Sequence, residues 1–359
     1  MSSRRRSDPS QLSLFEAPPP PAPSATEPAP LPLSPRSLEP AYYEEAAQLA
    51  ARLPPGLRMG TSTWSFPGWE GIVYARRRSV QELARDGLEE YARHPLLGTV
   101  GIDRSFYAPV PEIDYLRYAR QLPPGFLCPS KAPHAVMAQV FQAPGQPDDE
   151  RGPTVLENPD FLSAPLFADM HARPLLAAFR EHAGPVILEI PPVGPVNRLP
   201  PRVFLDRLDA FLAEAPRELR YAVELRERAY LTPEYAEVLK ARGAAHAYTY
   251  WRAMPLPGAQ AKVVPVTQAP FALVRLSLRP GRAYEAEKER FAPFNRIVEP
   301  DPRMRAEVVE ILCAAAAAGI PSFVLVNNKA EGSAPLTVRA LAELAAEAWS
   351  GREGGCDRR

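Results

Sequence analysis

Short apolar segments alternate with amphipathic ones along most of the chain, and this alternation restricts the fold more than any other feature. The eight predicted strands are 57–63, 98–104, 126–131, 185–190, 220–226, 244–250, 271–277 and 320–326. The helices predicted between and after them are 79–93, 111–121, 166–182, 202–213, 232–241, 303–318 and 335–349. Because each helix returns the chain to the edge at which the previous strand began, consecutive strands are expected to run parallel.

Eight strand–helix units over roughly 290 residues match the size of a (β/α)₈ barrel, so the predicted fold class is α/β with a single TIM-type barrel. The alternative is a doubly wound open sheet, whose GxGxxG signature is absent. The sixth unit is the least regular, since no helix is predicted in the Pro-rich stretch 253–270. The long connections 132–165 and 278–302 each follow a strand, and we expect them to cover the active-site face.

Composition divides the chain into three regions. Residues 1–39 are predicted to form a disordered, Pro-rich tail, because 11 of the first 40 residues are proline and such a segment buries too little surface to offset its ordering entropy. Residues 40–350, beginning with a helix near 40–53, are predicted to form the barrel. Residues 351–359 are predicted to form a flexible C-terminal tail.

Bulk properties argue against several classes of protein. The formal net charge is +0, which gives no general attraction to nucleic acid or membrane, and no run of about 18 apolar residues predicts a membrane span. The N-terminus lacks an apolar signal core and the three cysteines are scattered, so we expect a cytoplasmic protein. No His and Cys spacing matches a metal site, and neither a metal nor a cofactor is predicted.

Charged and amide side chains gather where the predicted strands end. Because the carboxyl ends of parallel strands line the ligand cleft, this predicts a pocket for a small anionic, sugar-like or nucleotide-like ligand. Glu224, Glu189 and Lys131 are the candidate catalytic residues, as acids, bases or, for the lysine, a phosphate contact. The candidate ligand-binding residues are Thr61, Trp64, Asp103, Tyr107, His134, Arg226, Arg275, Asn327 and Asn328.

The two-residue period of a strand predicts which of these side chains share a face. Glu224 and Arg226 should project the same way as Ala222, and their pairing should hold Glu224 ionised. For any one pair, a purely structural ion network is as good an interpretation as a functional one. For the whole set, at one end of successive strands, we favour function. After the first strand, the hydroxyls and Trp64 suit a stacked sugar or base, with a packed aromatic turn as the alternative.

Several short motifs, taken together and in order, resemble one known family. They are Gly60-Thr61-Ser62-Thr63-Trp64-Ser65, Ser105-Phe106-Tyr107, Lys131-Ala132-Pro133-His134, Ile190-Pro191-Pro192, Val223-Glu224-Leu225-Arg226 and Asn327-Asn328. The chain is similar in these positions to the YecE-like family, also called domain of unknown function 72, over about residues 57–345. The resemblance implies a TIM-type barrel with a cleft at the strand carboxyl ends, and it implies no particular activity.

A second motif lies in the N-terminal tail. Gln11, Leu12, Leu14 and Phe15 belong to a pentapeptide that resembles the one with which bacterial DNA-maintenance proteins bind the replication sliding clamp. A mobile strand of this kind would insert its apolar side chains into a hydrophobic pocket, with modest affinity. The match predicts the DNA polymerase sliding clamp as a partner, and chance similarity is the alternative.

Two functional hypotheses follow. In the first, the barrel is an enzyme that acts on a nucleotide, DNA or a carbohydrate-like substrate, and the tail tethers it to the clamp in a role such as DNA repair. In the second, the barrel is a non-catalytic ligand-binding or adaptor protein recruited by the same tail. A metal-dependent barrel nuclease is less favoured, because histidines are nearly absent from the strand ends.

Overall fold

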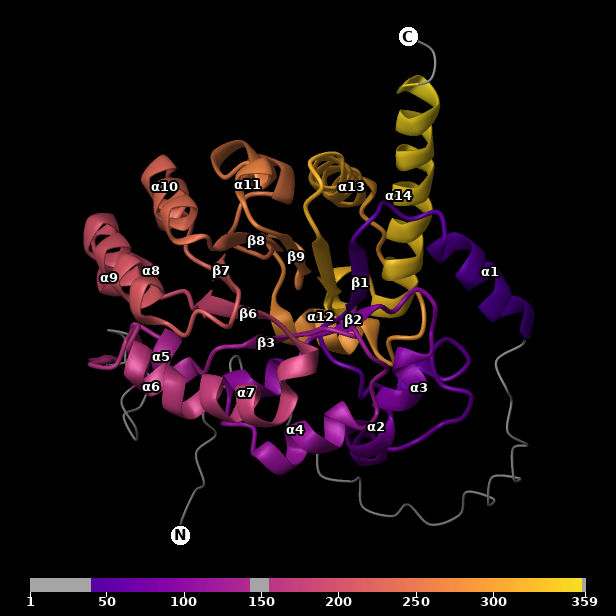
Figure 1. The fold of residues 1–359 in the computed structure, drawn as a ribbon, viewed down its shortest axis with the longest axis horizontal. Helices are drawn as coiled ribbons and strands as arrows, with labels where there is room; N and C mark the ends of the chain where they lie inside the picture. The colour runs from indigo at the N-terminus through magenta and orange to yellow at the C-terminus, as the bar shows by residue number, and fades with distance from the viewer. Residues whose placement is uncertain (1–39, 143–154, 357–359) are drawn as a thin grey trace.

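A ring of eight parallel strands surrounded by helices forms the body of the protein (Figure 1). The computed structural model describes residues 40–142 and 155–356. The barrel strands are β1 (Leu57–Thr61), β2 (Thr99–Val100), β3 (Cys128–Lys131), β6 (Ala183–Ile190), β7 (Tyr221–Leu225), β8 (Ala245–Tyr250), β9 (Ala272–Leu276) and β10 (Ser322–Val326). Their order in the sheet is β2-β1-β10-β9-β8-β7-β6-β3. Parallel bridges from Thr99 to Leu127 and from Ile102 to Ser130 join the two ends, which confirms the predicted barrel.

Helices follow the strands on the outside of the ring. The longer ones are α2 (Val80–Asp86), α3 (Leu88–Ala92), α4 (Glu112–Ala119), α7 (Arg173–Phe179), α9 (Pro201–Glu214), α10 (Pro233–Arg242), α11 (Pro257–Val263), α12 (Tyr284–Phe291), α13 (Pro302–Ala317) and α14 (Ala334–Cys356), with α1 (Pro40–Ala50) packed on α14. Single turns complete the connections: α5 (His134–Met137), α6 (Ala164–Phe167), α8 (Gly194–Asn197), η1 (Pro67–Trp69), η2 (Asp103–Phe106), η3 (Ala168–Ala172), η4 (Arg180–His182), η5 (Arg228–Tyr230), η6 (Val266–Gln268) and η7 (Asn328–Ala330).

Local capping explains where several helices begin and end. The Ser79 side chain accepts from the Glu82 backbone N–H, and the Glu82 carboxylate accepts from the Ser79 N–H, a capping box that starts α2. Gly87 stands between α2 and α3, as the C-cap of the first and the N-cap of the second. The helix predicted over 79–93 is therefore two shorter ones. At the other end of α10, Gly243 takes a left-handed conformation with φ of 64° and stops the helix.

Two irregular regions of the prediction contain helices or strands among their described residues. The sixth unit does contain a helix, α11, contrary to the expectation for 253–270, and its first residue is Pro257, which a first turn tolerates because that position needs no N–H donor. The connection 132–165 includes α5, α6 and an antiparallel pair, β4 (Val140–Gln142) with β5 (Val155–Glu157). The connection 278–302 includes α12, which packs against η7 at the carboxyl end of β10.

The interior of the barrel has an apolar floor. Its members are all nearly inaccessible: Ile187, Ala222, Ala245, Ala247, Phe271, Leu273, Phe323 and Leu325. Alanines on neighbouring strands leave room for the two phenylalanine rings, so large and small side chains fill the ring together. Polar side chains at the next inward-facing position of several of these strands lie above this floor. They are at the carboxyl ends of the strands, where the sequence analysis predicted the pocket.

The structure describes none of the predicted N-terminal tail and only part of the predicted C-terminal tail. The tail motif Gln11–Phe15 and the rest of 1–39 lie outside the described residues. At the other end α14 extends to Cys356, past the expected boundary at 350. Within 40–142 and 155–356, no helix combines the length and the apolar character that crossing a membrane requires.

Candidate functional site

Six charged side chains form a closed ring of alternating sign at the carboxyl end of the barrel. We call this set the charge ring; its members in order are Lys131, Glu189, Arg226, Glu224, Arg275 and Asp103. They come from β3, β6, the residue after β7, β7, β9 and η2. The strand register explains the gathering, since Glu189 is paired with Glu224 across β6 and β7, and inward-facing residues recur at every second position.

Every member of the charge ring contacts two members of opposite charge. Lys131 Nζ lies 2.7 Å from Glu189 Oε2 and 3.7 Å from Asp103 Oδ2. Arg226 Nη2 lies 3.1 Å from Glu189 Oε2 and 2.5 Å from Glu224 Oε1.

The remaining links of the ring run through Arg275. Its two Nη atoms donate to the two oxygens of Asp103 over 2.9 and 3.0 Å, a bidentate pair. Its Nε lies 3.0 Å from Glu224 Oε2, a charge contact without hydrogen-bond alignment. With three cations and three carboxylates, the charge ring is neutral as a whole.

Depth separates the carboxylates of the charge ring. The Glu189 side chain is 13% exposed, whereas that of Asp103 is 6% exposed and that of Glu224 is fully buried. Glu224 also accepts from the Thr249 hydroxyl at 3.1 Å. An entering ligand would therefore meet Glu189 first, and Glu224 acts behind it by holding Arg226 and Arg275.

The ring keeps Glu189 and Asp103 ionised. Burial opposes ionisation of Glu189, but Arg226 and Lys131 outweigh it and hold the pKa of Glu189 well below its usual value. Asp103 follows the same pattern: burial opposes its ionisation, while Arg275 and Lys131 hold its pKa low. Burial opposes the charge of Arg275, and Asp103 with Glu224 overcomes this and raises its pKa. At neutral pH the accessible carboxylate is thus a hydrogen-bond acceptor and not a proton donor.

Unused hydrogen-bond donors lie beside the ring. Among the described residues, Arg226 Nε and Nη1 have no hydrogen-bond partner although they are buried. The central carbon of the Arg226 guanidinium lies 3.9 Å from the centre of the Trp251 ring, a cation–π contact. The indole N–H of Trp251 also has no partner in the described part of the chain. Buried donors of this kind are costly unless something pairs with them.

A comparison with known families decides the identity of the chain. The sequence profile described as "Protein of unknown function DUF72" matches residues 58–354. The chain belongs to the DUF72 family. The YecE-like resemblance drawn from the motifs is thereby confirmed for the folded part of the chain. No curated protein is significantly similar to it in sequence.

Solved structures of other family members have the same fold. A DUF72 protein from Thermotoga maritima matches with a TM-score of 0.56 and 17% identity, covering 80% of this chain and 98% of the other. A DUF72 protein from Enterococcus faecalis matches with a TM-score of 0.51 and 14% identity, covering 80% and 96%. At such identities the similarity shows a shared fold alone.

Two other predicted site residues of this DUF72 protein lie near the charge ring. Tyr107 is half-buried, and its pKa is raised by burial and then by the carboxylates of Glu189 and Asp103. His134 packs edge-on against Phe106, 5.1 Å between ring centres, and burial lowers its pKa. Phe106 in turn lies 4.8 Å from Lys131 Nζ. The rings of Phe106 and His134 thus flank the Lys131 side of the charge ring.

The two asparagines at the end of β10 organise the neighbouring loops. Asn328 Oδ1 accepts from the Trp69 indole N–H at 3.2 Å and from the Ala334 N–H at 2.8 Å, which ties the loop after β1 to the start of α14. Its Nδ2 has no partner among the described residues. Asn327 Oδ1 accepts from the Lys329 N–H at 3.1 Å.

Thr61 and Trp64, both predicted ligand contacts, are not brought to the charge ring. Thr61 pairs in register with Val326 and faces outward, where its hydroxyl lies 2.8 Å from the hydroxyl of Tyr91 on α3. Trp64 donates its indole N–H to the Leu83 carbonyl at 2.9 Å, within the helical layer. The packed aromatic turn, the alternative weighed for Trp64, describes this arrangement. Period-two alternation would have selected Ser62 instead of Thr61 for the inward face.

Other residues at the mouth were missed by the sequence analysis. Thr249 and Trp251 lie at the end of β8, and Lys329 lies two residues beyond Asn327. Strand alternation from Ala247 would have found Thr249, and extending the strand-end search by two residues would have found Lys329. Tyr284, whose ring contacts Lys329, comes from the cover helix α12 and left no signal in the sequence.

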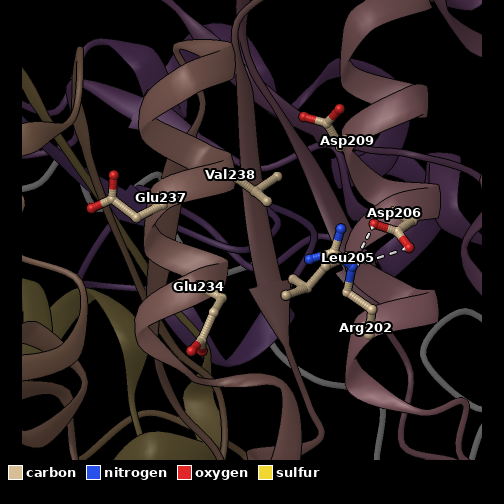
Figure 2. A pocket seen from close by; sticks show the side chains of 7 residues that line it. All are labelled: Arg202, Leu205, Asp206, Asp209, Glu234, Glu237 and Val238. Atoms are coloured by element: carbon tan, nitrogen blue, oxygen red, sulfur yellow. Dashed lines mark hydrogen bonds and ion pairs between the residues drawn. The ribbon is translucent and has the colours of Figure 1, made fainter.

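Two surface hollows lie elsewhere in the DUF72 barrel. Figure 2 shows a pocket of about 320 Å³ between α9 and α10, lined by Arg202, Leu205, Asp206, Asp209, Glu234, Glu237 and Val238. A second, of about 400 Å³, lies between the β4–β5 pair and α9. Both are on the outer helical layer, and neither includes a member of the charge ring. No three His, Cys, Asp or Glu side chains within the described ranges are grouped so as to hold a metal ion.

Proposed function

We propose that the charge ring binds a small hydroxyl-rich molecule, a sugar or a polyol, and that Glu189, Lys131 and Arg226 are the groups that touch it. The observation that carries this is the alternation of charge around the ring. The hydroxyls of such a molecule can donate to the carboxylates and accept from the cations at once. A simple anion would meet as many negative as positive groups.

The geometry favours binding and polarisation of the ligand over proton transfer by Glu189. Its pKa is lowered, so it remains a carboxylate that accepts from ligand hydroxyls. Arg226 offers two buried N–H donors without protein partners in the described part of the chain, and they would be satisfied by ligand oxygens. Glu224 would act as a positioning residue, because it touches both arginines and is fully buried.

The proposal is tested by calorimetric titration of the full-length protein with a panel of neutral sugars and polyols. Glu189→Gln should weaken binding of any panel member about tenfold or more, since hydrogen bonds to a charged acceptor contribute about 1.5–3 kcal/mol each. Glu237→Gln on the exposed face of α10 is the matched control and should bind as the wild type does. Circular dichroism establishes that each variant is folded. Failure of the whole panel to bind, or equal binding by folded Glu189→Gln, would refute the proposal.

A separate proposal concerns the partner. We infer that Gln11, Leu12, Leu14 and Phe15 bind the replication sliding clamp and place the barrel near DNA. Support comes from the motif and from its Pro-rich surroundings alone. A fluorescently labelled peptide spanning these residues should bind a purified bacterial clamp saturably in anisotropy measurements. A peptide with Leu14 and Phe15 changed to alanine should not bind, and equal signals from the two peptides would remove the link to the clamp.

A further inference from the structure

A buried lysine lies next to the charge ring without belonging to it. Lys329, in η7, is 4% exposed. Its Nζ lies 4.1 Å from the centre of the Tyr284 ring and 3.4 Å from Asn327 Oδ1. The same Asn327 oxygen also accepts a hydrogen bond from the Lys329 backbone N–H, so the ammonium shares this acceptor with the backbone.

Lys329 has no negatively charged ion-pair partner among the described residues. Four cationic side chains are buried in the described ranges, and the other three, Lys131, Arg226 and Arg275, each contact two carboxylates. No carboxylate of the described residues forms an ion pair with Lys329. Burying an ammonium without a counter-charge is costly, and natural proteins seldom do so without a use for it.

The electrostatic surroundings follow from the same geometry. Burial, and then the neighbouring ammonium of Lys288, lower the pKa of Lys329 to about 7, with Glu285 opposing this. Lys288 and Glu285 are on α12, as is Tyr284, whose phenol pKa is raised by burial. Because the charge ring is neutral in sum, a protonated Lys329 adds positive charge beside it.

We propose that Lys329 binds the anionic group, a carboxylate or a phosphate ester, of the hydroxyl-rich molecule that the charge ring binds. This inference rests on the proposed function for the class of the ligand, but the anion subsite itself rests on Lys329 and its surroundings. The anion takes the place of the Tyr284 ring as the partner of the ammonium. It also provides a negative charge that no described residue places against the ammonium, so the lysine is fully protonated when the site is occupied.

Sulfate is the probe of choice, because it stays dianionic across the pH range in which Lys329 titrates. Isothermal titration of the full-length protein with sodium sulfate, at constant ionic strength, compares the wild type with Lys329→Gln and Lys329→Arg. The glutamine variant should bind about tenfold to a hundredfold more weakly, as expected for the loss of a charge-assisted contact. Lys240→Gln, which removes an exposed lysine of α10, should leave binding unchanged.

Proton uptake separates this site from any surface lysine. In buffers of different ionisation enthalpy, the wild type should take up a proton on binding sulfate at pH 8 and almost none at pH 6. The arginine variant should bind without uptake at either pH, because arginine is always charged. Absence of saturable binding to the wild type, binding by Lys329→Gln equal to that of the wild type, or no uptake at pH 8 would each overturn the inference.

The two proposals fail separately. If Glu189→Gln loses binding of neutral sugars while Lys329→Gln binds sulfate as the wild type does, the proposed function is supported and the anion subsite is refuted. If sulfate binding depends on Lys329 but no neutral panel member binds, the anion subsite is supported and the proposed sugar or polyol ligand is refuted.

Discussion

Replacing Lys329 with methionine should stabilise the protein by an amount that depends on pH. Methionine keeps the unbranched stem and removes the ammonium. The pKa of Lys329 is about 7 in the folded chain, against 10.5 for an ordinary lysine, a difference of 3.5 (10.5 − 7). Each unit corresponds to about 1.36 kcal/mol, so the full cost of burying the charged form is about 5 kcal/mol below pH 7.

The sign of the pH dependence follows from proton binding. Because the folded pKa is lowered, the unfolded chain binds more protons than the folded one between pH 7 and 10.5. The stability of the wild type therefore gains from this group as pH rises through that window, and the methionine variant has no such gain. From pH 7.5 to 9.5, the advantage of Lys329→Met over the wild type should shrink by about 2–3 kcal/mol, since each pH unit in this window contributes a little over 1 kcal/mol.

Urea unfolding followed by circular dichroism at pH 7.5, 8.5 and 9.5 measures this difference. Other titrating groups are shared by the two proteins and cancel in the comparison. Lys240→Met, at an exposed position of α10, should run parallel to the wild type at all three pH values. A Lys329→Met profile that also runs parallel would show that Lys329 is not buried as an unpaired ammonium, and the argument for an anion subsite would lose its basis.

Three further predictions concern the ring, the barrel wall and the cover. Glu224→Gln removes a carboxylate that forms ion pairs with two buried arginines, one of them Arg275. It should lower the free energy of unfolding by about 3–5 kcal/mol in a urea titration. Gly60→Ala places a Cβ 1.8 Å from the Thr99 carbonyl oxygen and should cost about 3 kcal/mol or more, whereas a melting temperature equal to that of the wild type would contradict the close packing of β1 on β2. Glu299→Gln weakens the ion pairs that hold 278–302, and limited trypsin digestion should cut this segment faster than in the wild type.

The inward-facing side chains illustrate how far local pattern reaches. Glu224, Arg226 and Arg275 were placed at the pocket from strand ends and a two-residue period, and the structure brings all three together. The same period applied to β1 would have chosen Ser62, but the cluster of hydroxyls and tryptophan drew attention to Thr61, which faces Tyr91. Where the register was followed strictly, the pattern predicted which charged side chains meet at this end of the barrel.

Elements without periodicity were harder to predict. Helix α11 has seven residues in a Pro-rich stretch, too few to show an amphipathic repeat, and packing on α13 supports it. The cover helix α12 is strongly polar, and its Tyr284 reaches Lys329 only because the loop folds back over η7.

The amino-acid sequence alone determined the alternation of strands and helices, the barrel that follows from it, and the end of the barrel at which polar groups gather, because these depend on short-range stereochemistry and on the period of buried side chains. Only the tertiary structure decided which charges meet. Arg275 and Asp103 are 172 residues apart and become partners when the ring of strands closes. That closure also completes the neutral charge ring and leaves Lys329 without an ion-paired carboxylate among the described residues, since distance, burial and the number of opposite charges are properties of the assembled barrel and not of any segment.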